Sequence, residues 1–359
     1  MFFTCANHAP SNESGGARKA SNGSKSLTVD IHCHCESAQA GELMREEATR
    51  TGHAALAFGN DLTRTINEQQ LIAIQPKMSS LDERLADMDA MGIDIQAISI
   101  APYQYYYWAE PEVGRHVSSL MNDHLAETAA RKPERFVALG TVPLQDTEMA
   151  VAELERCVKE LGMRGVEIST NVNGEELSDP RLDKFFAKVA ELDVLIFIHP
   201  LGFTHADRFR DHYFINLVGH PLESTLAISQ LIFGGVLERY QGLKICIAHG
   251  GGYLPAYAGR MDHGYHARAD CREGLPSPPG SYLKKLYFDT MVFEPDQITF
   301  LVAKYGSDHV LLGSDYPYDM GEANPIALVD GVPTLSEEDR KAICGLNAAR
   351  LLKLSVQVP

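Results

Sequence analysis

The sequence lacks an uninterrupted apolar run of about 18 residues, which is the least that a membrane-spanning helix needs. Residues 1–26 also lack the continuous apolar segment of a secretory signal peptide. Cysteine is scarce, with seven residues at spacings that form no disulfide framework. These absences lead us to expect a cytoplasmic protein with reduced thiols and no membrane partner.

Positive charge is also in deficit. Lysine and arginine total 32 against 48 aspartates and glutamates, which gives a net charge of −16. A surface of this sign is poorly suited to the phosphate backbone of nucleic acids, so we expect no nucleic-acid partner. A few local arginines can still collect a small anionic substrate within such a surface.

No glycine-rich phosphate-binding loop follows the first apolar segment, which disfavours an open doubly wound sheet, the second candidate fold. Instead, eight short apolar segments alternate with segments of helical spacing, which predicts an α/β fold, a closed (β/α)8 TIM barrel. We expect strands over 27–31, 95–100, 136–142, 165–169, 194–198, 243–248, 286–289 and 310–313, and helices over 80–92, 112–131, 147–161, 180–192, 223–236 and 335–353. Residues 27–359 then form one barrel domain with insertions at 36–80 and 201–222, and residues 1–26 form a disordered extension.

Five residues that can bind a metal or transfer a proton stand at the carboxyl ends of expected strands: His32, His34, His199, His249 and Asp315. Barrel enzymes place their catalytic groups at this rim. Each residue has a simpler explanation when taken alone, since a histidine can pack in a core and an aspartate can cap a helix. Five such residues at strand ends are hard to explain as packing, because a buried histidine without a partner carries a desolvation cost.

The donor set predicts one divalent metal ion held by His32, His34, His199 and Asp315. Three imidazole nitrogens and a carboxylate suit zinc and leave a position for substrate, although manganese, cobalt or iron also accept these donors. The fourth expected strand ends in Ser-Thr-Asn at 169–171, without a lysine that could bridge a second metal. We assign the remaining residue, His249, as general acid and base, and a further metal ligand is the competing assignment.

Cys33 and Cys35 alternate with the two histidines of the first strand. Successive side chains of a strand point to opposite faces, so cysteines beside site-facing histidines should face away from the site. We therefore expect packing roles for both. Three glycines after His249, at 250–252, are expected to let the backbone approach a ligand closely.

The segments HCH, IHP, AHGGGYLPAYAGRMDHGY and LLGSDYP resemble the amidohydrolase superfamily, in particular its aminocarboxymuconate-semialdehyde decarboxylase branch, over about 29–352. The resemblance implies the same four metal ligands, with Asp315 and His249 in catalysis. It also implies that Arg260 holds a substrate carboxylate and that Arg268 reaches into a neighbouring subunit, hence a homodimer or a dimer-based oligomer. An arginine suits bidentate recognition of a carboxylate.

The sequence departs from this pattern around the substrate. Lys77 is the cation in a segment that usually carries an arginine, and Arg64 lies further upstream as a substitute. Leu201 replaces a tryptophan after the His-Pro pair, and the single tryptophan is Trp108, which follows Tyr103, Tyr105 and Tyr106. This aromatic cluster either forms a wall of the substrate site or packs in the core or at an interface.

We therefore expect a metal-dependent, non-oxidative decarboxylase of a carboxylated muconate semialdehyde or a related aromatic or unsaturated acid, with a small-molecule carboxylate as substrate. The alternative is a hydrolase or hydratase of aromatic catabolism, which acts on a C–C bond, a lactone or an enol acid on the same scaffold. A non-enzymatic metal-binding barrel is the third interpretation. All three interpretations place a metal ion at the same site, and only the two enzymatic ones give His249 a role in proton transfer.

Overall fold

The computed structural model describes residues 26–52, 59–202 and 206–355, and the expected extension lies outside them except for residue 26. Eight parallel strands lie close to the predicted positions: β1 (Val29–Cys35), β2 (Ile95–Ile100), β3 (Phe136–Ala138), β4 (Gly165–Ile168), β7 (Leu195–Ile198), β8 (Lys244–Ile247), β9 (Tyr287–Asp289) and β10 (Val310–Leu311). A small antiparallel hairpin, β5 (Asn171–Val172) and β6 (Glu175–Glu176), follows β4.

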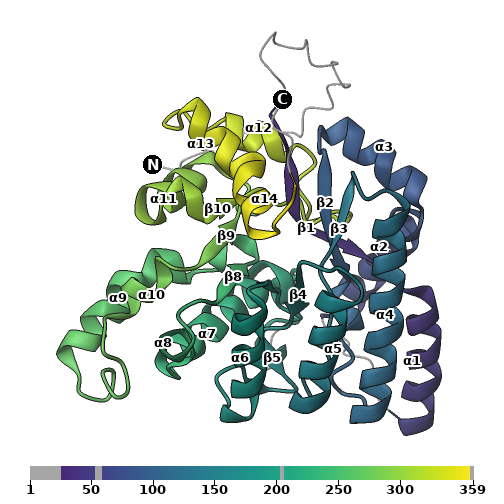
Figure 1. Cartoon of the computed structure of the whole chain (residues 1–359), viewed down its shortest axis with the longest axis horizontal. Helices are drawn as coiled ribbons and strands as arrows, with labels where there is room; N and C mark the ends of the chain where they lie inside the picture. Colours follow the sequence, from purple (N-terminus) through teal and green to yellow (C-terminus); the bar gives the residue numbers. More distant parts are fainter. Residues whose placement is uncertain (1–25, 53–58, 203–205, 356–359) are drawn as a thin grey trace.

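The strands close into a barrel. Hydrogen bonds join β1, β2 and β3 in one group and β4, β7, β8, β9 and β10 in another. Two parallel bridges, Gly140 with Val166 and Cys33 with Tyr316, connect the groups at both seams. The predicted TIM barrel is therefore confirmed, and all strand carboxyl ends meet at one rim (Figure 1).

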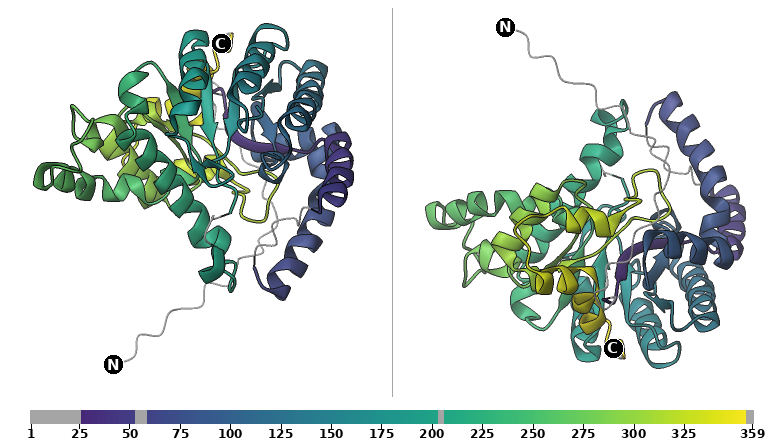
Figure 2. Two further views of the ribbon diagram at one scale, coloured as in Figure 1. Left: turned by 90° about the horizontal axis from the view of Figure 1, so that it is seen from below. Right: turned by 90° about the horizontal axis from the view of Figure 1, so that it is seen from above.

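Helices surround the barrel, as Figures 1 and 2 show. They are α1 (Ala38–Thr51), α2 (Asp61–Ser79), α3 (Leu81–Met91), α4 (Pro111–Arg131), α5 (Thr147–Lys159), α6 (Asp183–Leu192), α7 (His220–Phe233), α8 (Val236–Arg239), α9 (Leu254–Ala267), α10 (Pro279–Leu283), α11 (Pro295–Tyr305), α12 (Pro325–Asp330), α13 (Glu337–Lys341) and α14 (Asn347–Leu351). The α3 helix begins as its sequence predicts, because the Ser80 side chain accepts a hydrogen bond from the Glu83 amide. No helix in the described ranges is long and apolar enough to cross a membrane.

The two insertions are largely helical. The first forms α1 and α2, and the second contains a π-helical turn, η4 (Ile215–Gly219), that leads directly into α7. Figure 2 shows α2 in dark blue and the segment entering α7 in teal on the same side of the barrel. Both segments contribute to the wall of one pocket, so the insertions shape the space above the barrel rim.

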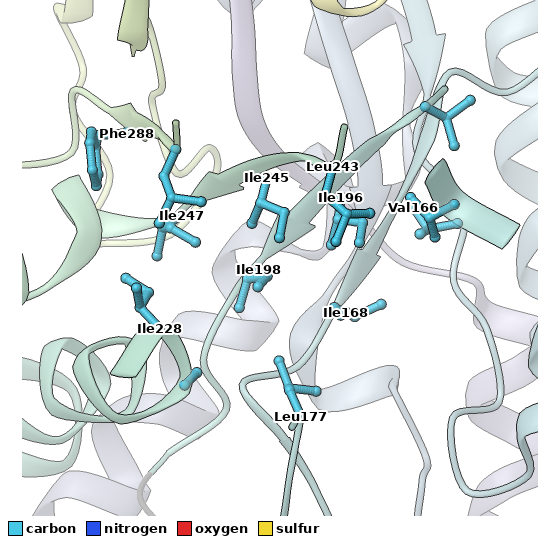
Figure 3. Close-up of a cluster of buried hydrophobic side chains, with 14 of the residues drawn as sticks. Val166, Ile168, Leu177, Ile196, Ile198, Ile228, Leu243, Ile245, Ile247 and Phe288 are labelled. Atoms are coloured by element: carbon cyan, nitrogen blue, oxygen red, sulfur yellow. The ribbon is translucent and has the colours of Figure 1, made fainter. Parts of the chain in front are cut away.

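Side chains that alternate along each strand fill two separate cores. Leu195 and Phe197 belong to the inner core, which draws on strands around the barrel and on α14. Their neighbours Ile196 and Ile198 belong to the outer core, between the strands and the helices. Figure 3 shows these isoleucines beside the equivalent side chains of β4 and β8. Truncating one of them to alanine should cost about 2–5 kcal/mol, so the strand ends rest on a rigid support.

Candidate active site

The five residues predicted at the strand ends meet at one point of the rim. The ring centroid of His199 lies 4.9 Å from that of His32, 5.0 Å from that of His34 and 5.0 Å from that of His249. Asp315 faces the rings, with Oδ1 at 3.3 Å from Nε2 of His32 and 3.2 Å from Nε2 of His34. Its Oδ2 lies 3.6 Å from Nε2 of His249.

An irregularity in β1 allows both of its histidines to face this point. The pairing of β1 with β2 shifts register between Asp30 and Cys33. Below the shift, Val29 and Ile31 face the inner core, whereas above it Cys33 and Cys35 face the outer core. The expectation that the cysteines pack away from the site is therefore confirmed, although simple alternation from residue 29 would have given the opposite faces.

The donor atoms of this cluster fit a cation. Among the described residues, both ring nitrogens of His199, Nε2 of His32, Nε2 of His34 and Oδ1 of Asp315 are buried without a hydrogen-bond partner. Buried polar atoms are ordinarily paired, and several orphaned nitrogen and oxygen donors that face one another suit a divalent metal. One subset, His32, His199, His249 and Asp315, has ligand atoms within 4.8 Å of one another. The geometry thus places His249, like His34, among the possible ligand atoms around Asp315. It is compatible with His249 as general acid and base and with His249 as a further metal ligand.

A buried carboxylate behind the site orients one of the rings. Nδ1 of His32 lies 2.7 Å from Oδ2 of Asp289, the last residue of β9. The same carboxylate accepts backbone hydrogen bonds from His249, Gly250 and Met291, at 3.1, 2.8 and 3.1 Å. This contact directs Nε2 of His32 toward Asp315, which is how a carboxylate behind a histidine ligand prepares it for a metal.

A second carboxylate, Glu167 of β4, lies behind His34. Its Oε2 is 4.0 Å from Nδ1 of that ring, and its two oxygens accept hydrogen bonds from the hydroxyls of Ser99 and Tyr105. Burial raises the pKa of Glu167, while His34 and the two hydroxyls oppose that rise. Neither Asp289 nor Glu167 was predicted, although a carboxylate inside an apolar strand segment is a signal that the sequence does contain.

The charges of the cluster are strongly coupled. Burial alone would lower the pKa of His32, but Asp315 and Asp289 outweigh it and raise that pKa well above its usual value. Burial and the neighbouring rings lower the pKa of His199 well below its usual value. Burial opposes ionisation of Asp315, but the surrounding histidines hold its pKa well below the usual range. At neutral pH the metal-free site therefore presents an ionised Asp315, a neutral His199 and a protonated His32, so His32 has to release its proton when a metal binds.

Two of the site residues adopt a conformation that side chains rarely take. His249 has a φ of 56° and Asp315 a φ of 54°, in the left-handed region. Such residues are concentrated at functional sites, where the surrounding structure offsets their cost.

The glycines after His249 lie tightly against neighbouring protein segments. A Cβ on Gly250 would lie 2.4 Å from Val292, and one on Gly252 would lie 2.1 Å from the carbonyl oxygen of Pro221. They therefore permit close packing of protein against protein, and a close approach of this backbone to a ligand stays a prediction.

A pocket of about 180 Å³ opens beside the cluster. Its wall is lined by Asn67, Gln70, Leu71, Pro102, Tyr103, His199, Pro200, Leu201, Tyr213, Asn216, His220, Asp315, Tyr318, Asp319 and Met320. Leu201 and Tyr103 thus lie where the sequence placed a substrate site. His220 was not predicted, because the first residue of α7 follows no strand and carried no signal. No lysine or arginine belongs to the described lining.

The predicted basic residues lie elsewhere in this single chain. Lys77 pairs with Asp87, at 2.8 Å between Nζ and Oδ2, and Arg64 pairs with Asp61 and with the carbonyl of Gly59. Arg260 and Arg268 are exposed on α9 and just after it, and Arg268 pairs with Asp270 at 2.7 Å. The aromatic cluster divides, with Tyr105 buried, Tyr103 in the pocket wall, and Trp108 packed against the outer core.

Comparison with known proteins places the chain in a family. The amidohydrolase family pattern matches residues 29–354. The chain is 39% identical over 274 residues to a 2-amino-3-carboxymuconate-6-semialdehyde decarboxylase of Dictyostelium discoideum, which covers 76% of each protein. It is 31% identical over 297 residues to a γ-resorcylate decarboxylase of Rhodococcus jostii, covering 76% of this chain and 87% of the relative.

A solved structure shows the same fold. The 5-carboxyvanillate decarboxylase of Novosphingobium aromaticivorans, complexed with manganese and 4-hydroxy-3-methoxy-5-nitrobenzoic acid, is similar with a TM-score of 0.82 and 25% identity. The similarity covers 92% of this chain and 96% of that one. A barrel with five metal-competent or proton-transferring residues at its rim, matched from β1 to beyond α14, makes this chain a member of the amidohydrolase family.

Proposed function

We propose that this protein is a metal-dependent, non-oxidative decarboxylase of a carboxylated muconate semialdehyde or a related aromatic or unsaturated acid. The observation that carries the proposal is the convergence of three orphaned imidazoles and one carboxylate on a single point beside a small pocket. The similarity to decarboxylases of muconate-semialdehyde and hydroxybenzoate type supports this reaction class.

The four residues His32, His34, His199 and Asp315 would hold one divalent ion. Zinc suits this donor set, and the manganese in a 25% identical decarboxylase supports manganese as the alternative. Such an ion acts as a Lewis acid toward a substrate oxygen. Metal analysis of the purified protein tests the assignment, and we expect about one divalent ion per chain. Less than about a tenth of an ion per chain after incubation with zinc and manganese would contradict it.

His249 is the proposed proton donor. When the bond to the carboxyl group breaks, its electron pair stays on the substrate carbon and CO2 leaves. That carbon then needs a proton, and the imidazole beside Asp315 supplies it. The left-handed backbone of His249 and the hydrogen bond from its amide to Asp289 fix the position of this ring.

The remaining charge of the substrate needs partners that the described pocket of one chain does not contain. The resemblance implies this partner role for Arg268 alone, but Arg260 is also exposed and absent from the described pocket lining. We therefore propose that both arginines serve a neighbouring subunit in a homodimer. Figure 1 shows α9 projecting from the barrel, and Tyr257 on this helix is 60% exposed. Mixing an Arg268→Ala chain with a His249→Ala chain tests the proposal, because a mixed dimer keeps one intact site. Activity that returns on mixing supports sharing, and activity that stays absent counts against it.

A panel of carboxylated muconates and hydroxybenzoates tests the reaction itself. Metal-replete protein should release one CO2 for each substrate consumed, and the His249→Ala protein should not. No CO2 from any member of the panel would contradict the proposal.

A hydratase is the second candidate. The chain is 28% identical over 265 residues to a 2-keto-4-carboxy-3-hexenedioate hydratase of a Sphingobium species, covering 71% of each protein. The same metal and base can add water across a double bond. Reaction in ¹⁸O-labelled water separates the two, because a hydration product keeps the label and a decarboxylation product gains only a proton.

A further inference from the structure

The pocket wall contains a histidine that has no part in the proposed metal site or proton transfer. His220, the first residue of α7, is partly buried, and its ring stacks on that of His249 with centroids 6.0 Å apart and an interplanar angle of 27°. Its centroid is 6.3 Å from that of His199. His220 therefore lies directly beside the proposed proton donor, in the wall of the same pocket.

A neighbouring amide sets which nitrogen of this ring carries the proton. Nδ2 of Asn216, in the η4 turn, lies 3.4 Å from Nδ1 of His220. An amide nitrogen only donates, so Nδ1 of the ring accepts and the hydrogen of a neutral ring resides on Nε2. Among the described residues Nε2 has no hydrogen-bond partner, and both residues line the pocket.

A second neutral donor lies in the same wall. Nε2 of Gln70, on α2, is buried without a hydrogen-bond partner among the described residues. A buried amide that lacks a partner costs free energy, which a ligand oxygen would recover. Gln70 comes from the first insertion and His220 from the second, so both insertions supply a donor to one pocket.

We infer that His220, held in its Nε2–H form by Asn216, and Gln70 recognise an oxygen substituent of the substrate away from the carboxyl group that leaves. The inference rests on the proposed function and adds to it two residues that would select acids carrying a keto, hydroxyl or aldehyde oxygen as a hydrogen-bond acceptor. A site built to satisfy such an oxygen rejects analogues that lack it, because its donors are then left unpaired.

The tautomer of His220 is the first test, and it needs neither metal nor substrate. Nitrogen NMR of ¹⁵N-histidine-labelled, metal-free protein should show a protonated Nε2 and a bare Nδ1 for His220, assigned by the loss of its signals in His220→Gln. Asn216→Asp should reverse the tautomer, because a carboxylate accepts a hydrogen bond from Nδ1–H. A wild-type ring protonated on Nδ1 would overturn the inference, whatever reaction the enzyme catalyses.

Ligand binding is the second test. The probe is 4-hydroxy-3-methoxy-5-nitrobenzoic acid, titrated by calorimetry into manganese-loaded protein. His220→Leu and Gln70→Leu should each raise Kd about tenfold, whereas His220→Gln, whose amide nitrogen replaces Nε2–H, should keep Kd within about twofold. Leu217→Ala, an exposed residue of the same η4 turn, is the control. Equal Kd values in the leucine variants and the wild type, or no binding to the wild type, would contradict the inference.

Discussion

The carboxylate of Asp289 reaches behind the site and contacts Nδ1 of His32 at 2.7 Å. Asp289 and His32 are 257 positions apart in the chain, and neither side chain has measurable exposure. Closure of the barrel alone brings them together, since β9 pairs with β10 and the segment after β10 pairs with β1. The orientation of a proposed metal ligand thus depends on the fold as a whole.

Removing the charge of Asp289 should weaken metal binding. Asp289→Asn keeps the shape of the side chain but no longer stabilises a ring that donates from Nδ1. We expect metal affinity to fall about 10–100-fold in competition with a chelating dye. Asp296→Asn, an exposed position on α11, is the matched control. Identical affinities in the two variants would show that Asp289 has no influence on the site.

Replacing His249 separates its two assignments. As a proton donor, His249→Ala should retain the metal content of the wild type and lose about 10²–10⁴-fold in kcat. As a ligand, it should lose metal and activity together. Parallel measurement of metal content and turnover decides between them, and a loss of metal would contradict the proton-donor assignment.

The glycine at 252 should be essential for folding. Its φ is 65°, and an added Cβ would lie 2.1 Å from the backbone oxygen of Pro221, which cannot move away as a side chain can. Gly162 is a matched control, because its φ is 70° but nothing lies within 4 Å of an added Cβ. Gly162→Ala should cost about 1–2 kcal/mol of backbone strain. Gly252→Ala should lower the free energy of unfolding, measured by chemical denaturation, by at least about 2 kcal/mol more than Gly162→Ala does. Equal losses in the two variants would refute the close approach of Gly252 to the backbone of Pro221.

Acid should destabilise the protein partly through His220. Burial, with a smaller contribution from His249, lowers the pKa of His220 to about 3. In the unfolded chain the ring takes up a proton near pH 6.5, so between about pH 6.5 and 3 the unfolded state binds more protons. Stability is therefore lost as the pH falls through this window. Between about pH 6.5 and 5, the free energy of unfolding of the metal-free wild type should fall by about 1–2 kcal/mol more than that of His220→Gln. If the unfolding free energies of the two proteins change in parallel with pH, the lowered pKa of His220 is contradicted.

The sequence predicted the barrel well because the strands have a strong physical signal. Segments such as 194–198 are apolar throughout, as parallel strands buried on both faces must be. Helices were harder to predict: α9 and α11 were missed, and the segment 335–353 is not one helix but α13, a π-helical turn and α14. A single π-helical turn changes the backbone hydrogen bonds from the i→i+4 to the i→i+5 pattern. It alters the spacing of apolar residues too little to be recognised in the sequence.

The site was predicted in part, for a similar reason. The rim residue His32 lies in β1, and His199 and Asp315 come after β7 and β10; barrel topology alone brings these strand ends together. Asp289 and Glu167 lie within strands, His220 follows the π-helical turn η4, and the register shift in β1 depends on pairing between chain segments. These features arise from tertiary contacts, which local periodicity does not encode.

The central claim is that one cation is held by three histidines and one aspartate at the barrel rim. A crystal structure of metal-replete protein, with anomalous data at the absorption edges of zinc and manganese, tests it most directly. The account predicts one anomalous peak per chain, bonded to His32, His34, His199 and Asp315 at about 2.0–2.2 Å. A peak bonded to other residues, or none at this point, would contradict it.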